Sequence, residues 1–426
     1  MAHSLTNNQD FNHKSKLSGK TDLFLNLFWF GFVVYTIIYT ISITGHIPFR
    51  LIVMFQIVQI SSMFLFLISA FMLLQIRFAN NYLRITYVLY CCWQLSVVIR
   101  GFIFDVEYLK TSLLDAWFGI FIYFVPLILL FPKEIAGYKK IFNVIVILAG
   151  FYLFFDLIFI KELLYPYGGN RLAQSLVEYF SRNLSIPCGF ILLTYLYHTN
   201  KKNLFSLSIV ILTFLFAAVR ARRSLMFMAI TLLVTSYLVF YFSNRGKIMK
   251  IVFSVIMILS LGIYGAYIYT LQKSGVFGLL TSRMHEDTRS GVINNFYRDM
   301  STTDWLIGRG VNGQYYCPGI DEGNRITTYR IVIETGYLQI ILKGGLISLA
   351  LLFIISIPAM IKGLFRSNNS FSKGAAIWIF WFLMNLYSSV GNAFILSYLL
   401  FWISIGICYE PGIITKTDDE IKRELL

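Results

Sequence analysis

Charged residues are scarce in this 426-residue chain. Only 13% of its positions are Asp, Glu, Lys or Arg, whereas a typical soluble domain carries about 25%. Hydrophobic residues make up 57% of the chain, and the mean hydropathy is +0.69. So little charge cannot cover a water-facing surface. The composition excludes a soluble cytosolic enzyme, a disordered chain and a soluble nucleic-acid-binding protein, so we expect no nucleic-acid partner.

Cysteine and histidine are also rare. The five cysteines contain no CxxC pair, and no two of the five histidines lie four residues apart. These patterns indicate neither a disulfide framework nor a zinc-binding helix. We therefore expect no metal and no cofactor.

Long apolar runs are what the chain has in abundance. A membrane helix needs roughly 20 mostly apolar residues, and such runs predict an all-α, polytopic integral membrane protein with about twelve transmembrane helices. Nine spans fall within residues 23–271 and three within 329–409, and the polar stretch 272–328 between them is expected to be one large external loop. The predicted spans are 23–44, 51–76, 85–104, 113–131, 141–160, 183–197, 204–219, 224–242, 250–271, 331–361, 375–390 and 392–409.

The basic residues predict how the chain is oriented. If residues 1–22 and 410–426 are cytoplasmic tails, these tails and alternate loops carry 19 of the 36 basic residues, as the positive-inside rule requires. Fourteen of those 19 are Lys, whereas 13 of the other 17 are Arg. Topology needs only charge, but the planar guanidinium group suits bidentate contact with phosphate or carboxylate. We therefore expect an external face that binds an anion; the alternative is arginines that snorkel at helix ends.

Three segments carry most of this external arginine. In the turn Arg220-Ala-Arg222-Arg223, the guanidinium groups repel one another unless an anion lies among them, although a solvated turn is an alternative. Residues 171–182 predict an amphipathic helix on the outer leaflet, because polar residues four, seven and eleven positions after Arg171 lie on the same face of a helix. An ordinary surface helix is the alternative. That face comprises Arg171, Ser175, Glu178 and Arg182, and the long loop holds Arg283, Arg289, Arg298, Arg309 and Arg325, followed by Arg330.

The long loop also contains a glycine-rich motif. Residues 308–313 read GRGVNG and fit GxGxxG. The dinucleotide interpretation of that motif requires a preceding strand and a following helix in a βαβ unit, which the sequence does not predict. A weaker interpretation is a turn whose backbone amides approach a ligand phosphate.

Two runs near this motif resemble a known family. The run from Asp304 to Gly313 (DWLIGRGVNG) and the run from Ile333 to Gly345 (IETGYLQIILKGG) resemble the O-antigen polymerase and ligase superfamily, and are most similar to Wzy-type polymerases of bacterial surface polysaccharides. The arginine-containing turn before Ser224 also matches. Ligases of the superfamily carry a His about eleven residues before the Gly of the ETG sequence. Here that position is Arg325, which favours a polymerase over a ligase.

The resemblance implies a GT-C-like, metal-independent glycosyltransferase at the outer face of the bacterial plasma (inner) membrane, with both termini cytoplasmic. The donor would be a growing glycan on undecaprenyl pyrophosphate, and the acceptor another lipid-linked repeat unit of an O-antigen, capsule or exopolysaccharide. Its partners would be this lipid-linked oligosaccharide, membrane lipid and a chain-length regulator protein. The competing interpretations are a repeat-unit flippase or transporter, an O-antigen ligase and a non-enzymatic assembly subunit.

The implied chemistry assigns roles to the external residues. Expulsion of the lipid pyrophosphate develops negative charge, which preorganised guanidinium groups would stabilise. We expect Arg222, Arg223, Arg283 and Arg289 to act in this way. Candidates for the general base are Glu178 and Glu334, with His285, Glu286 and Asp287 as further carboxylate or imidazole candidates. The expected substrate-binding residues are Arg171, Arg182, Arg220, Arg298, Arg309, Arg325 and Arg330.

Overall fold

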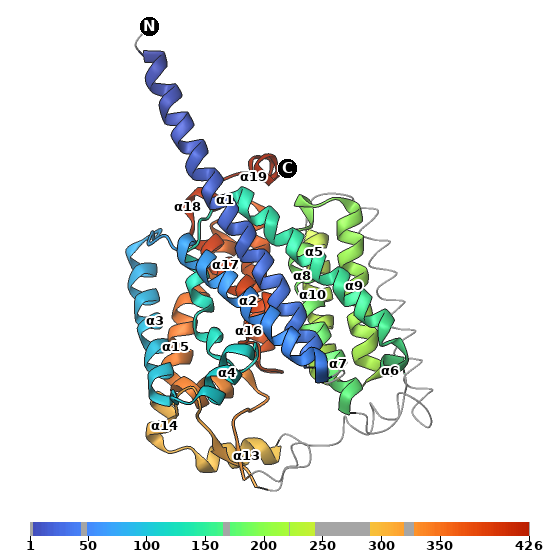
Figure 1. Ribbon diagram of the computed structural model, residues 1–426. Coiled ribbons are helices and arrows are strands. Elements are labelled where there is room, and N and C mark those ends of the chain that lie inside the picture. The colour runs from blue at the N-terminus through green and yellow to red at the C-terminus, as the bar shows by residue number, and fades with distance from the viewer. Residues whose placement is uncertain are drawn as a thin grey trace.

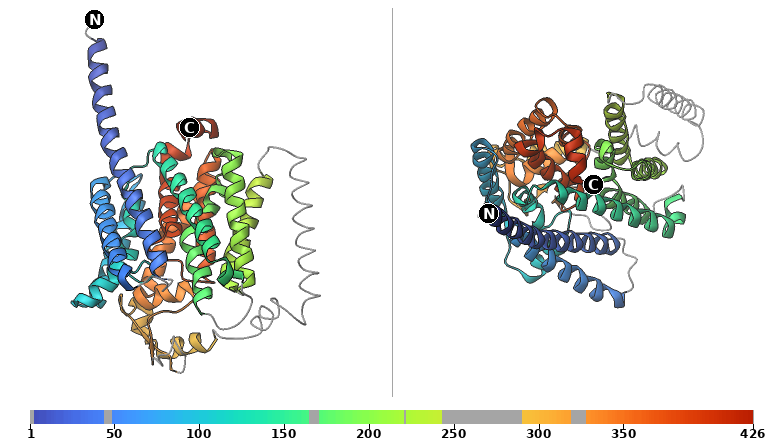
Figure 2. Two further views of the ribbon diagram at one scale, coloured as in Figure 1. Left: turned by 45° about the vertical axis from the view of Figure 1, so that its right-hand side comes forward. Right: turned by 90° about the horizontal axis from the view of Figure 1, so that it is seen from above.

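The computed structural model describes residues 3–43, 49–164, 171–220, 222–242, 290–318 and 328–425. Within these ranges the chain is a bundle of helices with one short two-stranded sheet (Figures 1 and 2). Seven described helices are long and apolar enough to cross a membrane, which confirms the all-α, multi-pass character predicted from composition. They are α1 (His3–Ser42, apolar from Gly19), α2 (Phe49–Leu73), α3 (Asn81–Gly101), α5 (Ile135–Ile158), α9 (Asn200–Val219), α10 (Arg223–Phe242) and α15 (Gly336–Phe365).

The remaining described elements are shorter. They are α4 (Val106–Leu114), α6 (Ile160–Leu164), α7 (Arg171–Phe180), α8 (Cys188–Leu193), α13 (Ser290–Asp299), α14 (Thr302–Ile307), α16 (Ser370–Asn385), α17 (Leu396–Tyr409), α18 (Pro411–Ile414) and α19 (Asp418–Leu425), the 3₁₀-helices η1 (Ile120–Tyr123), η2 (Val125–Leu130) and η4 (Tyr195–Tyr197), the π-helix η3 (Ser181–Ser185), and the antiparallel strands β1 (Tyr315–Tyr316) and β2 (Tyr329–Arg330).

Both ends of the chain lie at one end of the bundle, and α13 and α14 lie at the opposite end (Figure 1). We call these the terminal end and the α13 end. The arrangement agrees with the predicted topology, in which the two tails share one side and the long loop lies on the other. That the terminal end faces the cytoplasm stays a prediction from the basic residues.

The predicted span 113–131 is wrong as a single helix. α4 ends at Leu114, and the chain then continues as η1 and η2. Pro126, near the start of η2, has no amide hydrogen to extend a regular α-helix. Val125 and Leu129 are nevertheless buried in the core. Irregular backbone is tolerated at this depth because protein, rather than lipid, surrounds it.

The predicted span 183–197 is interrupted in a similar way. The π-helix η3 ends at Ser185, Pro187 precedes α8, and η4 completes the segment. Residues 181–185 are buried, so the predicted surface helix 171–182 ends inside the bundle rather than on the leaflet.

The other predicted spans differ mainly in their limits. The predicted spans 375–390 and 392–409 correspond to α16 and α17, and the predicted span 331–361 corresponds to α15, which begins at Gly336. α1 begins at His3, well before the predicted start at residue 23, because the first 18 residues contain no Pro or Gly to interrupt a helix. The predicted span 250–271 lies outside the described residues.

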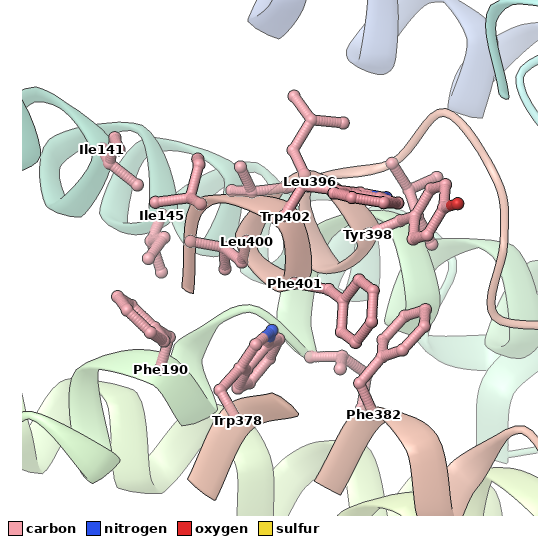
Figure 3. Packing of buried hydrophobic residues seen from close by; sticks show 14 of the residues in the cluster. Ile141, Ile145, Phe190, Trp378, Phe382, Leu396, Tyr398, Leu400, Phe401 and Trp402 are labelled. Atoms are coloured by element: carbon pink, nitrogen blue, oxygen red, sulfur yellow. The ribbon is translucent and has the colours of Figure 1, made fainter. Parts of the chain in front are cut away.

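α17 forms the centre of the core (Figure 3). All 14 of its residues are buried. The Phe401 ring lies 4.5 Å from that of Phe382, and the Trp402 ring lies 5.1 Å from that of Tyr90, measured between centroids. Because protein encloses α17, this short helix does not itself have to match the roughly 20-residue length of a lipid-exposed span.

The described part of the long polar stretch has its own structure. We call residues 290–318 and 328–335 the α13 unit. Its buried side chains Phe296, Tyr315 and Ile333 form a small core that continues onto Leu338 and Leu342 of α15. The expected external loop is therefore ordered where it is described, and it packs on the end of a membrane-spanning helix.

Candidate functional site

Arginine side chains gather at the α13 end of the bundle around one buried residue, Arg182. This residue lies in η3, directly after α7, and only 7% of its surface is exposed. Glu178 lies four residues earlier, so the two side chains meet on one helical face. Arg182 Nη2 lies 2.9 Å from Glu178 Oε1, and Arg222 Nη1 lies 3.4 Å from Glu178 Oε2. One carboxylate thus holds two guanidinium groups together.

The remaining contacts of Arg182 fix its orientation. Its Nη2 also donates to Ser224 Oγ at 2.9 Å, and its Nη1 donates to the Val390 carbonyl at 3.3 Å. The guanidinium carbon lies 5.3 Å from the centre of the Trp117 ring, a distance typical of a cation–π contact. Its Nε is buried without a hydrogen-bond partner among the described residues. We call Trp117, Glu178, Arg182, Arg222 and Ser224 the Arg182 cluster.

A second layer of polar contacts holds Trp117 in place. Trp117 Nε1 donates to Asn183 Oδ1 at 3.2 Å, and Asn183 Nδ2 donates to Thr40 Oγ1 at 3.0 Å. The carboxylate of Asp115 accepts from the Trp117 amide at 2.7 Å and from the Tyr39 hydroxyl at 2.9 Å. The face of Trp117 is therefore fixed toward Arg182 by α1, α4 and η3 together.

Tyr179 closes this side of the cluster. Its ring meets that of Trp117 edge-on, with centroids 5.8 Å apart. Burial, together with the carboxylates of Glu178 and Asp115, raises the pKa of Tyr179. Its hydroxyl, like that of an ordinary tyrosine, carries its proton at neutral pH and can donate to an acceptor.

The structure brings together only part of the predicted set. Glu178, Arg182 and Arg222 form one cluster, whereas Arg220 donates through Nε to the Leu163 carbonyl at 3.1 Å. Burial lowers the pKa of Arg220. Arg223 begins α10 and is exposed, and Arg171 is the first residue of α7.

Arg309 is engaged within the α13 unit. Its guanidinium group contacts Asp299 Oδ2 at 2.5 Å and Asp304 Oδ2 at 2.8 Å, and it also donates to the carbonyls of Asp299 and Gln314, both at 2.6 Å. Burial opposes ionisation of Asp304, but hydrogen bonds from Arg309 and Ser301 lower the pKa of this carboxyl overall. The contacts of Arg309 are those of a structural clamp, so we leave it out of the candidate site.

The glycine-rich motif joins the α13 unit to α15. Gly345 has φ of +69° and breaks α15, and the carbonyls of Leu342 and Lys343 accept from the amides of Arg309 and Gly310 at 2.8 and 2.9 Å. The motif amides at positions 308, 311 and 313 also donate to carbonyls of the protein. The interpretation of the motif as a phosphate-binding turn is therefore wrong.

Arg100 adds a second connection between the α13 unit and the bundle. Its Nη1 and Nη2 donate to the carbonyls of Gly308 and Ile307 at 3.0 and 2.8 Å. Residue type and location alone did not single out Arg100, because one arginine at the end of an apolar run is indistinguishable from a snorkelling side chain.

The other predicted residues fall into two groups. Arg298 and Glu334 are exposed, and Arg330 is half-buried in β2. Glu334 directly precedes Thr335, the N-cap residue of α15. The rest lie outside the described residues: Arg283, His285, Glu286, Asp287, Arg289 and Arg325.

An apolar cavity of about 210 Å³ lies between α1, α2 and η2. Its walls are almost entirely hydrocarbon and include Phe66, Ala70, Phe131 and Phe394. Phe394 connects it to the Arg182 cluster, because its amide donates to the Ala116 carbonyl at 2.6 Å, next to Trp117. The segment 390–394 therefore borders both sites, because the Val390 carbonyl accepts from Arg182 and Phe394 lines the apolar cavity.

Sequence reasoning selected Glu178, Arg182 and Arg222 but missed the residues that orient them. Asp115 and Trp117 were hidden inside the predicted span 113–131, where an acidic residue is itself a signal of function. Among the described residues, no group of three or more His, Cys, Asp and Glu side chains is arranged to hold a metal ion.

Comparisons with protein-family models, with curated proteins and with solved structures find no match to this chain.

Proposed function

We propose that this protein is a polysaccharide polymerase that transfers a growing glycan from a polyprenyl pyrophosphate to a second lipid-linked repeat unit. The observation that carries the proposal is the Arg182 cluster, in which two guanidinium groups converge on one carboxylate beside an apolar cavity. The resemblance of residues 304–313 and 333–345 to Wzy-type polymerases supports it independently.

The cluster suits an amphiphilic phosphate ligand. Guanidinium groups contact phosphate through two parallel N–H donors, and the buried Nε of Arg182 is a donor without a partner among the described residues. The apolar cavity nearby suits part of a hydrocarbon chain, because its lining offers almost no polar atoms. A head group at the cluster and a tail along the cavity would place the lipid across segment 390–394.

The proposed chemistry requires charge stabilisation at the leaving group. The acceptor hydroxyl attacks the anomeric carbon, the bond from that carbon to the pyrophosphate oxygen breaks, and negative charge collects on the departing pyrophosphate. Arg182 and Arg222 would stabilise this charge without further reorganisation, since Glu178, Ser224 and Trp117 already hold Arg182 in place.

Glu178 fits an orienting role in this scheme. Each of its carboxylate oxygens faces a guanidinium group, so both oxygens are already engaged in holding the two arginines. Glu334 is the exposed carboxylate of the predicted pair and remains our candidate for the general base.

The test uses purified full-length protein in detergent with a lipid-linked repeat unit, first alone and then together with a separate acceptor. Polymer formation without nucleotide supports the proposal. Transfer only to a separate acceptor such as a lipid A core would establish a ligase instead. Movement of the repeat unit across proteoliposomes without any polymer would establish a flippase, and either result would overturn the polymerase proposal.

A matched pair of arginine variants links activity to the cluster. Arg222→Ala should abolish long polymer, because it removes one of the two converging guanidinium groups. Arg366→Ala changes an exposed arginine just after α15 and should leave polymer length unchanged. Equal activity in the two variants would disconnect the reaction from the Arg182 cluster.

A further inference from the structure

Lys343 is a buried lysine without an acidic partner among the described residues. It lies in α15, two residues before the helix break at Gly345, and only 8% of its surface is exposed. Its Nζ donates to the Gly313 carbonyl at 2.9 Å. None of the ion pairs among the described residues involves it. An ammonium group in such an interior is strongly disfavoured unless a counter-charge lies nearby.

Lys343 is one of the residues that line a small cavity with several polar side chains. The volume of this cavity is about 30 Å³, which is room for roughly two water-sized groups. Ser348 Oγ accepts from Gln94 Nε2 at 3.1 Å, which leaves the serine proton free to point into the cavity. Asn392 Oδ1 is buried without a hydrogen-bond partner among the described residues, so it can accept from a water molecule. The other polar side chains of the lining are Tyr90, Tyr123 and Tyr398.

We propose that this cavity binds a small monovalent anion, chloride under ordinary conditions, next to Lys343 Nζ. The ammonium group and neighbouring hydroxyl groups supply donors, and the cavity has room for one such ion with one water molecule. Phosphate and sulfate, with four oxygens around a central atom, exceed this space. A metal cation is disfavoured by the adjacent ammonium group.

The bound anion would keep the α13 unit attached to the bundle. Lys343 contacts the glycine-rich motif at two points. Its carbonyl accepts from the Gly310 amide, and its Nζ donates to the Gly313 carbonyl. An anion beside the ammonium group would offset the cost of burying its charge and so favour the position in which Nζ contacts the Gly313 carbonyl. The proposal concerns a site separate from the Arg182 cluster and does not depend on polymerase activity.

The test is a halide titration of purified protein at fixed sodium concentration. Sodium halide replaces sodium gluconate stepwise, because gluconate is too bulky for the cavity. The thermal unfolding midpoint should rise and saturate with chloride or bromide, because a ligand that binds the folded state stabilises it. Protease cleavage within residues 290–318 should slow over the same concentration range. A midpoint that responds equally to gluconate and halide would overturn the proposal.

Two lysine variants separate this site from general salt effects. Lys343→Met should weaken the apparent halide affinity about 10- to 100-fold, which corresponds to the loss of one hydrogen bond to a charged group. The control is Lys362→Met in the same helix, since Lys362 also donates to a backbone carbonyl, that of Tyr409 at 3.1 Å. The control should keep the halide response of the wild type.

An independent measurement covers the case in which Lys343→Met fails to fold. Anomalous scattering from wild-type crystals grown with bromide should give a peak beside Lys343 Nζ. Saturating bromide without a peak in the cavity would show that water alone occupies it, and would refute the proposal.

Discussion

Replacing Arg182 by Lys tests whether the guanidinium geometry, rather than its charge, drives the proposed reaction. One arginine nitrogen, Nη2, contacts Glu178 and Ser224 at 2.9 Å each, while Nη1 reaches the Val390 carbonyl at 3.3 Å. A lysine ammonium is a single point and cannot reproduce contacts made by two nitrogens of a planar fork. We expect Arg182→Lys to lower the transfer rate by a factor of about 10²–10³, the range seen on loss of a preorganised donor to a developing anion.

The same substitution should affect stability less than activity. Breaking a fully buried ion pair costs about 3–5 kcal/mol. Here Glu178 keeps 30% of its side chain exposed and retains Arg222 at 3.4 Å. Arg182→Lys also preserves the positive charge, so we expect a loss nearer to that of one charged hydrogen bond, about 1.5–3 kcal/mol. The variant should therefore insert and fold.

The assay measures initial polymer formation from lipid-linked repeat units, together with thermal unfolding of the same preparation. Arg366→Ala serves as the control for loss of an arginine elsewhere. If Arg182→Lys folds and keeps a rate within about threefold of the wild type, a point charge is sufficient and the argument from fork geometry is refuted.

Three further predictions concern other parts of the molecule. Gly345→Ala should detach the α13 unit, because φ is +69° and a Cβ would lie 2.1 Å from a backbone oxygen. Faster proteolysis of the α13 unit would measure this detachment. The control is Gly150→Ala, which has no atom within 4 Å of the added Cβ and should change nothing. Ala70→Trp should fill the apolar cavity and raise KM for long polyprenyl donors but not for short ones. The control Leu157→Trp, at an exposed position, should leave KM unchanged for both kinds of donor. An equal effect of Ala70→Trp on long and short donors would contradict a role of the cavity in tail binding. Hydrogen bonds lower the pKa of Asp304 in the folded state, so its ionised carboxylate stabilises the α13 unit at pH values above the usual carboxyl pKa of about 3.9. Proteolysis of the α13 unit should therefore accelerate as pH falls through the folded-state pKa of Asp304. Asp304→Asn should remove this pH dependence, and an unchanged pH profile in that variant would contradict the assignment.

Local patterns in the sequence predicted what local physics determines. Apolar runs located the regular spans, because a lipid-exposed helix must carry about 20 such residues. The spacing of Glu178 and Arg182 put them on one face, and their side chains meet as an i, i+4 pair. The contact from Glu178 to Arg222 joins α7 to the connection between α9 and α10, so no spacing along the chain could have predicted it.

The predictions that failed concern features that depend on how distant segments pack together. The stretch 113–131 is as apolar as its neighbours, but Pro126 and the protein around it allow 3₁₀ turns where lipid would require a continuous helix. Arg309 belonged to the same external arginine group as Arg182. Its pairing with Asp299 and Asp304 depends on how α13 and α14 fold back on the glycine turn, and composition does not contain that information.

The central position of α17 has a consequence for how the protein is made. The helices α15 and α16 and the segments η2 and η3, which pack against α17, all precede it in the chain. The ribosome therefore delivers the walls of the bundle before its centre. At translation rates of about 5–20 residues per second, the early helices wait tens of seconds in the membrane for α17. During that interval the nascent bundle must remain open or be held by other membrane components, so substitutions that weaken α17 should first appear as a defect in biogenesis.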